Sequence, residues 1–135
     1  MTQTEKLTWR PFAPEDFERT AELLGRTWLP EFDEPAQHAA SQIELAHYLA
    51  QTTWSLLAER EGEILGVVLL SERDREAAGG AGWAELETRL TRAAEKDEAL
   101  AEAVRVEMDG VREEAELERK YAAEEPAGAD AAVEL

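Results

Sequence analysis

The segment that most constrains the fold is "TWSLLAEREGEILGVVLLS", which runs from residue 53 to residue 71. Two apolar stretches, 53–59 and 64–71, flank the polar sequence "REGE", in which Gly62 is free to adopt positive φ. This pattern predicts two antiparallel strands joined by a tight turn. The second stretch is a nearly continuous apolar run, which is typical of a strand buried on both faces.

One strand and two helices are predicted before this hairpin. Residues 7–12 alternate apolar and polar side chains, which indicates a short strand. Pro14 suits the first turn of a helix that ends at Pro30, with one apolar face formed by Phe17, Ala21, Leu24 and Trp28. A second helix is predicted over 35–50, and one of its faces carries Ile43, Ala46, His47 and Ala50.

The composition shifts after residue 71 toward Ala, Glu, Arg and Leu. A thin apolar stripe at helical spacing predicts a helix from Trp83 to Met108, a break at Asp109–Gly110, and a further helix over 111–123. The glycines of "AAGGAG", residues 77–82, are typical of a flexible linker. The final residues, "AAVEL", are predicted to open another strand.

The resulting order is strand, helix, helix, strand, strand, helical hairpin and strand, which predicts an α+β fold (α/β in some schemes). We expect one incomplete domain over residues 1–135. Its parts are an N-terminal sheet with helices at 1–71, a linker at 72–82, an acidic helical insertion at 83–125, and a loop with the start of a fourth strand at 126–135.

The charge of the chain excludes several classes of partner. The sequence has 31 acidic and 14 basic residues, a formal net charge of −17, which repels nucleic acids and anionic membranes and attracts amines or a basic protein. No apolar run approaches the roughly 20 residues of a membrane span, and the N-terminus lacks an apolar signal segment. Because the chain has no cysteine, no disulfide framework is expected, and we predict a cytoplasmic protein.

Three segments carry a resemblance to a known family. "LTWRPFAPEDFERTAELL" is similar to a first strand running into a first helix, and "WSLLAEREGEILGVVLLS" to a second and a third strand, with Gly66 inside the third. "AAVEL" is similar to the beginning of a fourth strand. In these segments the chain resembles the GNAT superfamily of acyl-CoA-dependent N-acetyltransferases, and residues 83–126 are similar to helical insertions of some bacterial members.

The resemblance implies acetyl transfer from acetyl-CoA to an amine, but the residues of the chemical half are not found. The family holds the CoA pyrophosphate on Arg/Gln-x-x-Gly-x-Gly/Ala at the start of the helix after its fourth strand, and the sequence contains no such run. Tyr48 and Tyr121 do not match the position of the family's late general acid. We therefore expect a truncated member that binds no acetyl-CoA tightly, and we assign it no catalytic residue.

The loop between the two predicted helices is the candidate site for the acceptor substrate, because in the family this loop often borders that site. Carboxylates beside aromatic rings suit an amine through ion pairing and cation–π contact. The alternative is a solvated acidic loop with its aromatic rings in the core. The candidate residues are Trp28, Glu31, Phe32, Asp33 and Glu34.

No metal site is expected, because His38 and His47 are nine residues apart and do not share the i, i+4 spacing of helical metal ligands. His47 is expected to be a semi-buried helix residue, although a histidine can also act as a general base. The tryptophans Trp9, Trp54 and Trp83 are predicted to pack in the core.

Two functions remain open from the sequence. The first is the N-terminal part of a GNAT acetyltransferase, inactive as this isolated chain. The second is a non-enzymatic, acidic interaction module that binds a basic partner protein or is completed by a second polypeptide. The apolar strand at 64–71 has an edge that could also mediate self-association.

Overall fold

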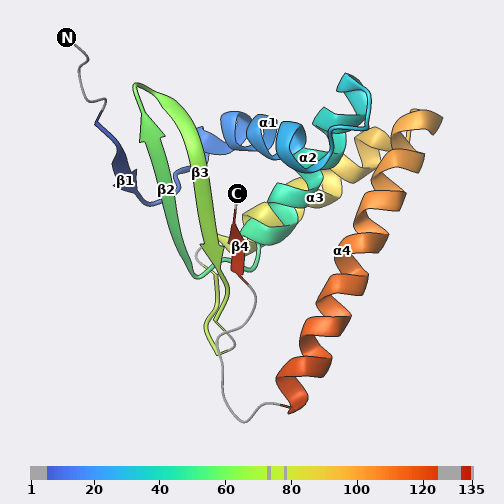
Figure 1. Cartoon of the computed structure of the whole chain (residues 1–135). Coiled ribbons are helices and arrows are strands. Elements are labelled where there is room, and N and C mark those ends of the chain that lie inside the picture. Colours follow the sequence, from blue (N-terminus) through green and yellow to red (C-terminus); the bar gives the residue numbers. More distant parts are fainter. Residues whose placement is uncertain (1–5, 73, 78, 125–131, 135) are drawn as a thin grey trace.

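The computed structural model describes residues 6–72, 74–77, 79–124 and 132–134, which form an α+β fold, as the sequence predicts (Figure 1). In chain order the elements are β1 (Thr8–Arg10), the 3-10 helix η1 (Pro14–Asp16), α1 (Phe17–Trp28), α2 (Glu34–Leu49), β2 (Trp54–Arg60), β3 (Glu63–Leu70), α3 (Gly80–Ala94), α4 (Glu98–Glu124) and β4 (Ala132–Glu134).

The predicted hairpin is confirmed. Strands β2 and β3 are antiparallel and pair from Trp54 opposite Leu70 to Arg60 opposite Glu63. The turn between them places Glu61 at φ 53° and Gly62 at φ 78°, so both turn residues adopt the left-handed conformation that tight hairpins need. The glycine adopts this conformation without steric cost, which explains why the chain reverses at "EG".

The sheet is antiparallel throughout, with the strand order β1-β2-β3-β4. Helices α1 and α2 connect the neighbouring strands β1 and β2, whereas α3 and α4 are inserted between β3 and β4. The predicted fourth strand is confirmed: β4 pairs with the end of β3, where Leu69 lies opposite Val133. The order of elements is therefore the predicted one.

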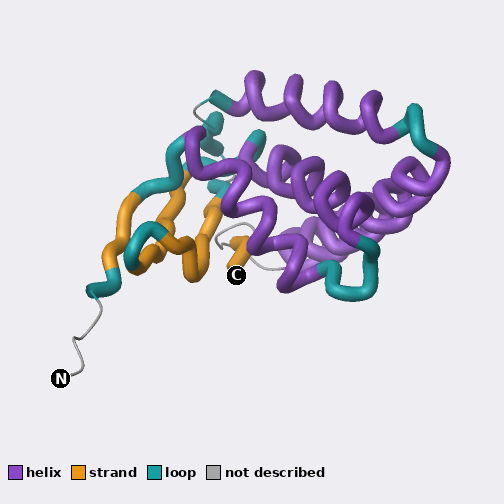
Figure 2. Tube along the Cα trace, turned by 90° about the horizontal axis from the view of Figure 1, so that it is seen from above, coloured by secondary structure: helices purple, strands orange, loops and turns teal. Residues whose placement is uncertain are grey.

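The helices gather on one side of the sheet, as the view from above shows (Figure 2). The covered face of the sheet contributes Leu57, Val67 and Leu69 to a buried group that we call the sheet cluster, together with Phe17, Ala21, Leu24, Leu45, Ala46, Leu49 and Ile64. A second buried group, the helix cluster, consists of Leu29, Ala40, Ile43, Ala94, Val104, Met108 and Val111. Burial of these apolar side chains is the main term that stabilises the fold.

Three side-chain placements on the sheet differ from the prediction. Strand β3 is buried on one face only, because the described helices cover one side of the sheet; Leu65, on the open side, is 38% exposed. Trp9 and Trp54 also lie on the open side, where they are 58% and 49% exposed and do not pack in the core. Trp83 does pack in the core, where its ring stacks on Phe17 at 5.4 Å between ring centroids.

The break between the inserted helices also differs from the prediction. It falls after α3 at residues 95–97, where Asp97 Oδ1 accepts hydrogen bonds from the backbone N–H groups of Ala99 and Leu100 at 3.0 and 3.2 Å. This side-chain cap starts α4. Gly110, predicted to break the helix, lies inside α4, because the neighbouring Met108 and Val111 are buried against α2 and hold the helix there.

Candidate functional site

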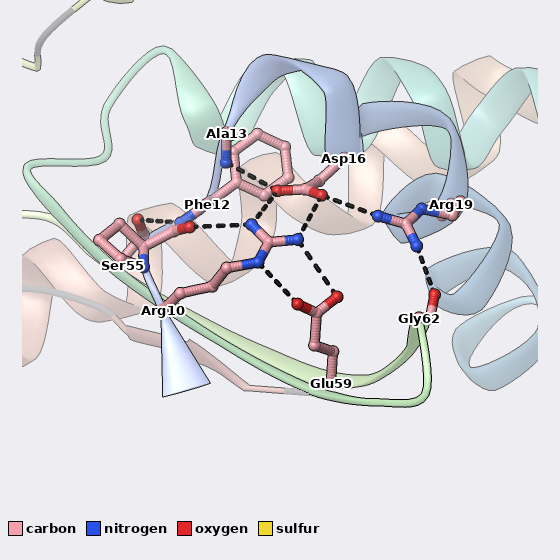
Figure 3. A network of polar contacts seen from close by, with 9 residues as sticks. Arg10, Phe12, Ala13, Asp16, Arg19, Ser55, Glu59 and Gly62 are labelled. Carbon is pink, nitrogen blue, oxygen red and sulfur yellow. Dashed lines mark hydrogen bonds and ion pairs between the residues drawn. The ribbon is translucent and has the colours of Figure 1, made fainter. Parts of the chain in front are cut away.

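A network of charged side chains connects β1, α1 and β2 (Figure 3). The Nη1 and Nη2 groups of Arg10 each donate to the Asp16 carboxylate at 2.7 Å, and Nε donates to Glu59 at 2.9 Å. Asp16 also accepts from the Ala13 backbone N–H at 2.8 Å and from Arg19 at 3.0 Å. The bidentate pair between a guanidinium and a carboxylate is the strongest geometry available to these groups.

This network is structural. The Asp16 side chain is fully buried, and its hydrogen bonds with Arg10 lower its pKa to about 2 despite that burial. Arg19 also donates to the carbonyl oxygen of Gly62, so the network holds α1 against the turn of the hairpin (Figure 3). Asp16 stays ionised at neutral pH and is no proton donor or acceptor there.

The loop predicted to border an acceptor site keeps its aromatic rings half-buried. The Trp28 ring meets the Tyr48 ring edge-on, with 6.3 Å between the ring centroids. Phe32 packs against the helix cluster. Both rings therefore pack against the helix cluster from the loop side.

The carboxylates of the same loop have different surroundings. Glu31 and Glu34 are exposed. Asp33 is engaged as the N-cap of α2, where its Oδ1 accepts from the backbone N–H of Ala36 at 3.0 Å. The predicted site residues thus share one loop, and the exposed carboxylates of Glu31 and Glu34 are the groups that a ligand can reach without displacing a cap.

Each histidine lies beside a carboxylate of another helix. His47 Nδ1 is 3.2 Å from Glu87 Oε1 of α3, and Gln51 Nε2 lies 3.3 Å from His47 Nε2. With its proton on Nδ1, the imidazole donates to Glu87 and accepts from the Gln51 amide. His38 Nε2 is 4.0 Å from Glu18, a long and exposed contact. The half-buried position of His47 agrees with the prediction.

The most unusual group lies where α2 packs on α4. Glu44 is 3% exposed, and its buried Oε2 makes no hydrogen bond. Its carboxyl group faces Glu107 of α4 and Tyr48, which lies one turn further along α2, and Glu114 acts on it from further along α4. Carboxyl groups from two helices therefore converge at the edge of the helix cluster.

Burial first, and the neighbouring carboxyl group of Glu107 second, raise the pKa of Glu44 to about 9. Glu44 is therefore protonated and neutral at pH 7. The pKa of Tyr48 is also raised, first by burial and then by the charges of Glu44 and Glu114. A positive charge bound beside Glu44 would lower this pKa, because a cation stabilises the ionised carboxylate.

Glu44 was not among the site residues predicted from the sequence, although a signal was present. Glu44 lies between Ile43 and Leu45, in a helix with apolar residues on two faces. A carboxyl group at such a position must be paired or protonated. Its neighbour Glu107 has no comparable signal, because only the packing of α4 on α2 brings it close.

A cleft of about 590 Å³ separates α3 from α4. Ala94, Val104 and Met108 line its apolar part. Its lining also includes Arg105 and Arg112, and both lie within ion-pair distance of Asp109, at 3.8 and 2.9 Å. The cleft thus offers apolar surface, and these two guanidinium groups are already partly neutralised.

The glycine-rich start of α3 does not fit a CoA pyrophosphate. Gly80, expected in a linker, lies in the first turn of α3, and a Cβ at this position would be 2.6 Å from the carbonyl oxygen of Ala50. The helix start thus abuts the carbonyl group of Ala50, the C-cap residue of α2, and this negatively polarised oxygen disfavours a phosphate there. Gly80 serves the close packing of α3 on the end of α2.

Within the described ranges 6–72, 74–77, 79–124 and 132–134, no group of three or more His, Asp or Glu side chains is arranged to hold a metal ion. No helix in the same ranges has the length and apolar character needed to cross a membrane.

Comparison with known proteins gives one structural similarity. No family model and no curated protein matches the chain. Among solved structures, the chain is similar to a GNAT family acetyltransferase from Brucella melitensis in complex with acetyl-CoA, with 19% identity over 67% of this chain and 71% of that chain and a TM-score of 0.38. Because this TM-score is low, the similarity carries no argument about activity.

Proposed function

We propose that this chain is the N-terminal part of a GNAT-type N-acetyltransferase, a class that transfers acetyl groups from acetyl-CoA to amines. The order of elements and of strands supports the proposal. Along the chain, α1 and α2 follow β1 and precede β2, and the helical insertion precedes β4. In the antiparallel sheet the strand order is β1-β2-β3-β4. This is the order that the sequence resemblance implies.

We propose further that the 135-residue chain does not itself bind acetyl-CoA tightly. The poor fit of the α3 start to a pyrophosphate supports this expectation. Isothermal titration calorimetry of the chain with acetyl-CoA is expected to give no saturable heat at micromolar concentrations. Saturable micromolar binding would contradict this part of the proposal.

The reading frame after the Leu135 codon tests the family assignment. A frame that continues into an apolar strand and then Arg/Gln-x-x-Gly-x-Gly/Ala would support an acetyltransferase. A stop codon directly after Leu135 would count against the enzyme and direct attention to a completing partner. Neither outcome depends on the expression or purity of the protein.

For the acceptor, we propose that Glu31 and Glu34 attract the amine, because both carboxylates are exposed beside half-buried aromatic rings. Double substitution to glutamine is expected to weaken the binding of a simple monoamine in calorimetry. Glu22→Gln on α1 is the control, because it also removes an exposed carboxylate. An equal loss of monoamine affinity in both variants would show that the net charge of the protein, and not this loop, attracts the amine.

A second candidate function is an acidic interaction module for a basic protein. The observation that favours it is the surface of α4, where Leu117 and Tyr121 are 55% and 64% exposed among acidic residues. Pull-down of a basic test protein by the chain, and its loss on Leu117→Ser with Tyr121→Ser, would support the module. Strand β4 pairs only with Val68–Leu70 of β3, so self-association would use the preceding part of that edge, and it would appear in size-exclusion chromatography as a dimer.

A further inference from the structure

We propose that the contact between α2 and α4 is a binding site for a linear polyamine, held by Glu107 and Glu114 above the buried carboxyl group of Glu44. The site lies on α2 and on the inserted helix α4. It does not depend on acetyl transfer, and we attach no chemical step to it.

The first observation is an unsatisfied polar atom. Oε2 of Glu44 is buried and has no hydrogen-bond partner, although its carboxyl group faces Glu107 and Tyr48. Leaving a buried acceptor unpaired costs free energy that an apolar side chain of similar size would avoid. An ammonium group supplies several N–H donors and provides the missing partner.

The second observation is the sign of the surrounding charge. Glu107 and Glu114 act electrostatically on Glu44, and Glu114 and Glu118 act on Tyr48, so these neighbouring charges are acidic. Like charges that converge on a buried group destabilise it, and a bound cation relieves the repulsion.

The nearby arginines of α4 face a different surface. Arg105 and Arg112 line the cleft between α3 and α4, and each lies close to Asp109. Val104 also lines this cleft, and with Val111 it forms an apolar stripe that packs beside Ala40 and Ile43 of α2. At 3.6 residues per turn, Glu107 and Glu114 lie on the other side of this stripe from Arg105 and Arg112. Helix α4 therefore separates its basic cleft side from the acidic contact with α2.

The geometry favours a flexible polyamine over a metal ion. Glu107 and Glu114 are two helical turns apart, roughly 10 Å along the axis, which is too far for one ion. No group of described carboxylates is arranged to hold a metal. The ring of Tyr48, half-buried beside Glu44, offers a surface for methylene groups and a cation–π contact. Ammonium groups joined by apolar spacers match these features.

Isothermal titration calorimetry with spermidine tests the proposal on the full chain. Saturable binding is expected, and Glu107→Gln and Glu114→Gln are each expected to weaken it about tenfold, the loss of one charge-assisted contact. Glu113→Gln is the matched control, because it removes an exposed carboxylate of the same helix and should change the affinity less than about twofold. Equal weakening by all three variants would overturn the proposal.

Proton release is the readout that general attraction of a polycation would not produce. Titrations at pH 7.5 in buffers of different ionisation enthalpy are expected to show release of a proton on binding, because the cation favours ionised Glu44. Glu44→Gln should still bind spermidine but release no proton. Binding without proton release in the native protein, or binding of tetralysine but not of spermidine, would overturn the polyamine site.

Discussion

Asp16 and Glu44 are both buried carboxyl groups, and their surroundings move their pKa values in opposite directions. Asp16 receives hydrogen bonds from Arg10 and Arg19, which favour the ionised form. Glu44 faces Glu107, which favours the protonated form. Burial is the largest cause of the raised pKa of Glu44, whereas the hydrogen bonds from Arg10 outweigh burial at Asp16.

Removing the Asp16 carboxylate should strongly destabilise the fold. Asp16→Ala leaves Arg10 half-buried without its bidentate partner, and we expect a loss of about 3–5 kcal/mol in the free energy of unfolding, measured by urea denaturation at pH 7. Because its pKa is lowered from 3.8 to about 2, ionised Asp16 stabilises the native protein above pH 3.8. The difference between the two proteins should therefore narrow as the pH falls toward 2. Glu15→Ala, an exposed neighbour, is the control.

Glu44 should make the protein less stable as the pH rises. Its pKa is raised from 4.5 to about 9, so the native state binds more protons than the unfolded state between these values, and stability falls across this window. Glu44→Gln mimics the protonated form and removes the contribution of Glu44 to this loss of stability. In denaturant titrations at pH 5 and pH 8, the variant should gain stability relative to the native protein at pH 8. An identical pH dependence of the two proteins would show that Glu44 titrates normally.

At the scale of single elements, glycines in the inserted helices have opposite roles. A side chain at Gly80 meets the carbonyl oxygen of Ala50, whereas Gly82, in the same turn of α3, has open space around it. The same substitution should therefore have opposite effects at two positions that are only two residues apart.

Gly80→Ala is expected to lower the melting temperature, because α3 must shift to admit the new Cβ. Gly82→Ala is the matched control and should stabilise α3 by up to about 1 kcal/mol, the usual difference in helix propensity. Thermal unfolding followed by circular dichroism compares the two variants with the native protein. If both variants raise the melting temperature, α3 does not approach the carbonyl oxygen of Ala50 as closely as the structure indicates.

Helix α4 has a packed first half and an exposed second half. Val104, Met108 and Val111 are buried, whereas Leu117 and Tyr121 are exposed. Local stability follows local packing, so the second half should open more readily. In hydrogen exchange, backbone amides of residues 115–121 are expected to exchange faster than those of residues 104–111. Uniform protection along α4 would indicate that a partner or a second copy covers its second half.

At the scale of the whole molecule, a sheet covered on one face is combined with a large excess of acidic residues. The described helices cover the face that carries Leu57 and Val67, and the other face leaves Trp9 and Trp54 exposed (Figures 1 and 2). The net charge of −17 opposes compaction through self-repulsion.

Salt should stabilise this protein. Raising NaCl from 0.02 M to 0.5 M shortens the Debye length from roughly 20 Å to below about 5 Å, which screens repulsion between carboxylates more than it weakens the buried Arg10–Asp16 pair. The melting temperature is expected to rise with NaCl. The double variant Glu113→Lys with Glu116→Lys, both on the exposed surface of α4, should show a smaller rise. A fall of the melting temperature with salt in the native protein would contradict this account.

Local patterns in the sequence determined the elements and the hairpin. Gly62 within "REGE" set the turn, and the apolar spacing from Phe17 to Trp28 set α1, because both depend on residues close along the chain. Local patterns failed at Asp109–Gly110, where burial of Met108 and Val111 overrides the low helix propensity of glycine.

Tertiary structure alone decided which faces are buried and which charges meet. Trp9 and Trp54 are exposed because the helices pack on one side of the sheet, and alternation within a strand does not reveal which side that is. Glu44 was visible as a carboxyl group among apolar residues, but its partner Glu107 comes from a helix more than sixty residues away. The pKa of Glu44 is raised first by burial and then by that contact, and the packing of the helices decides both.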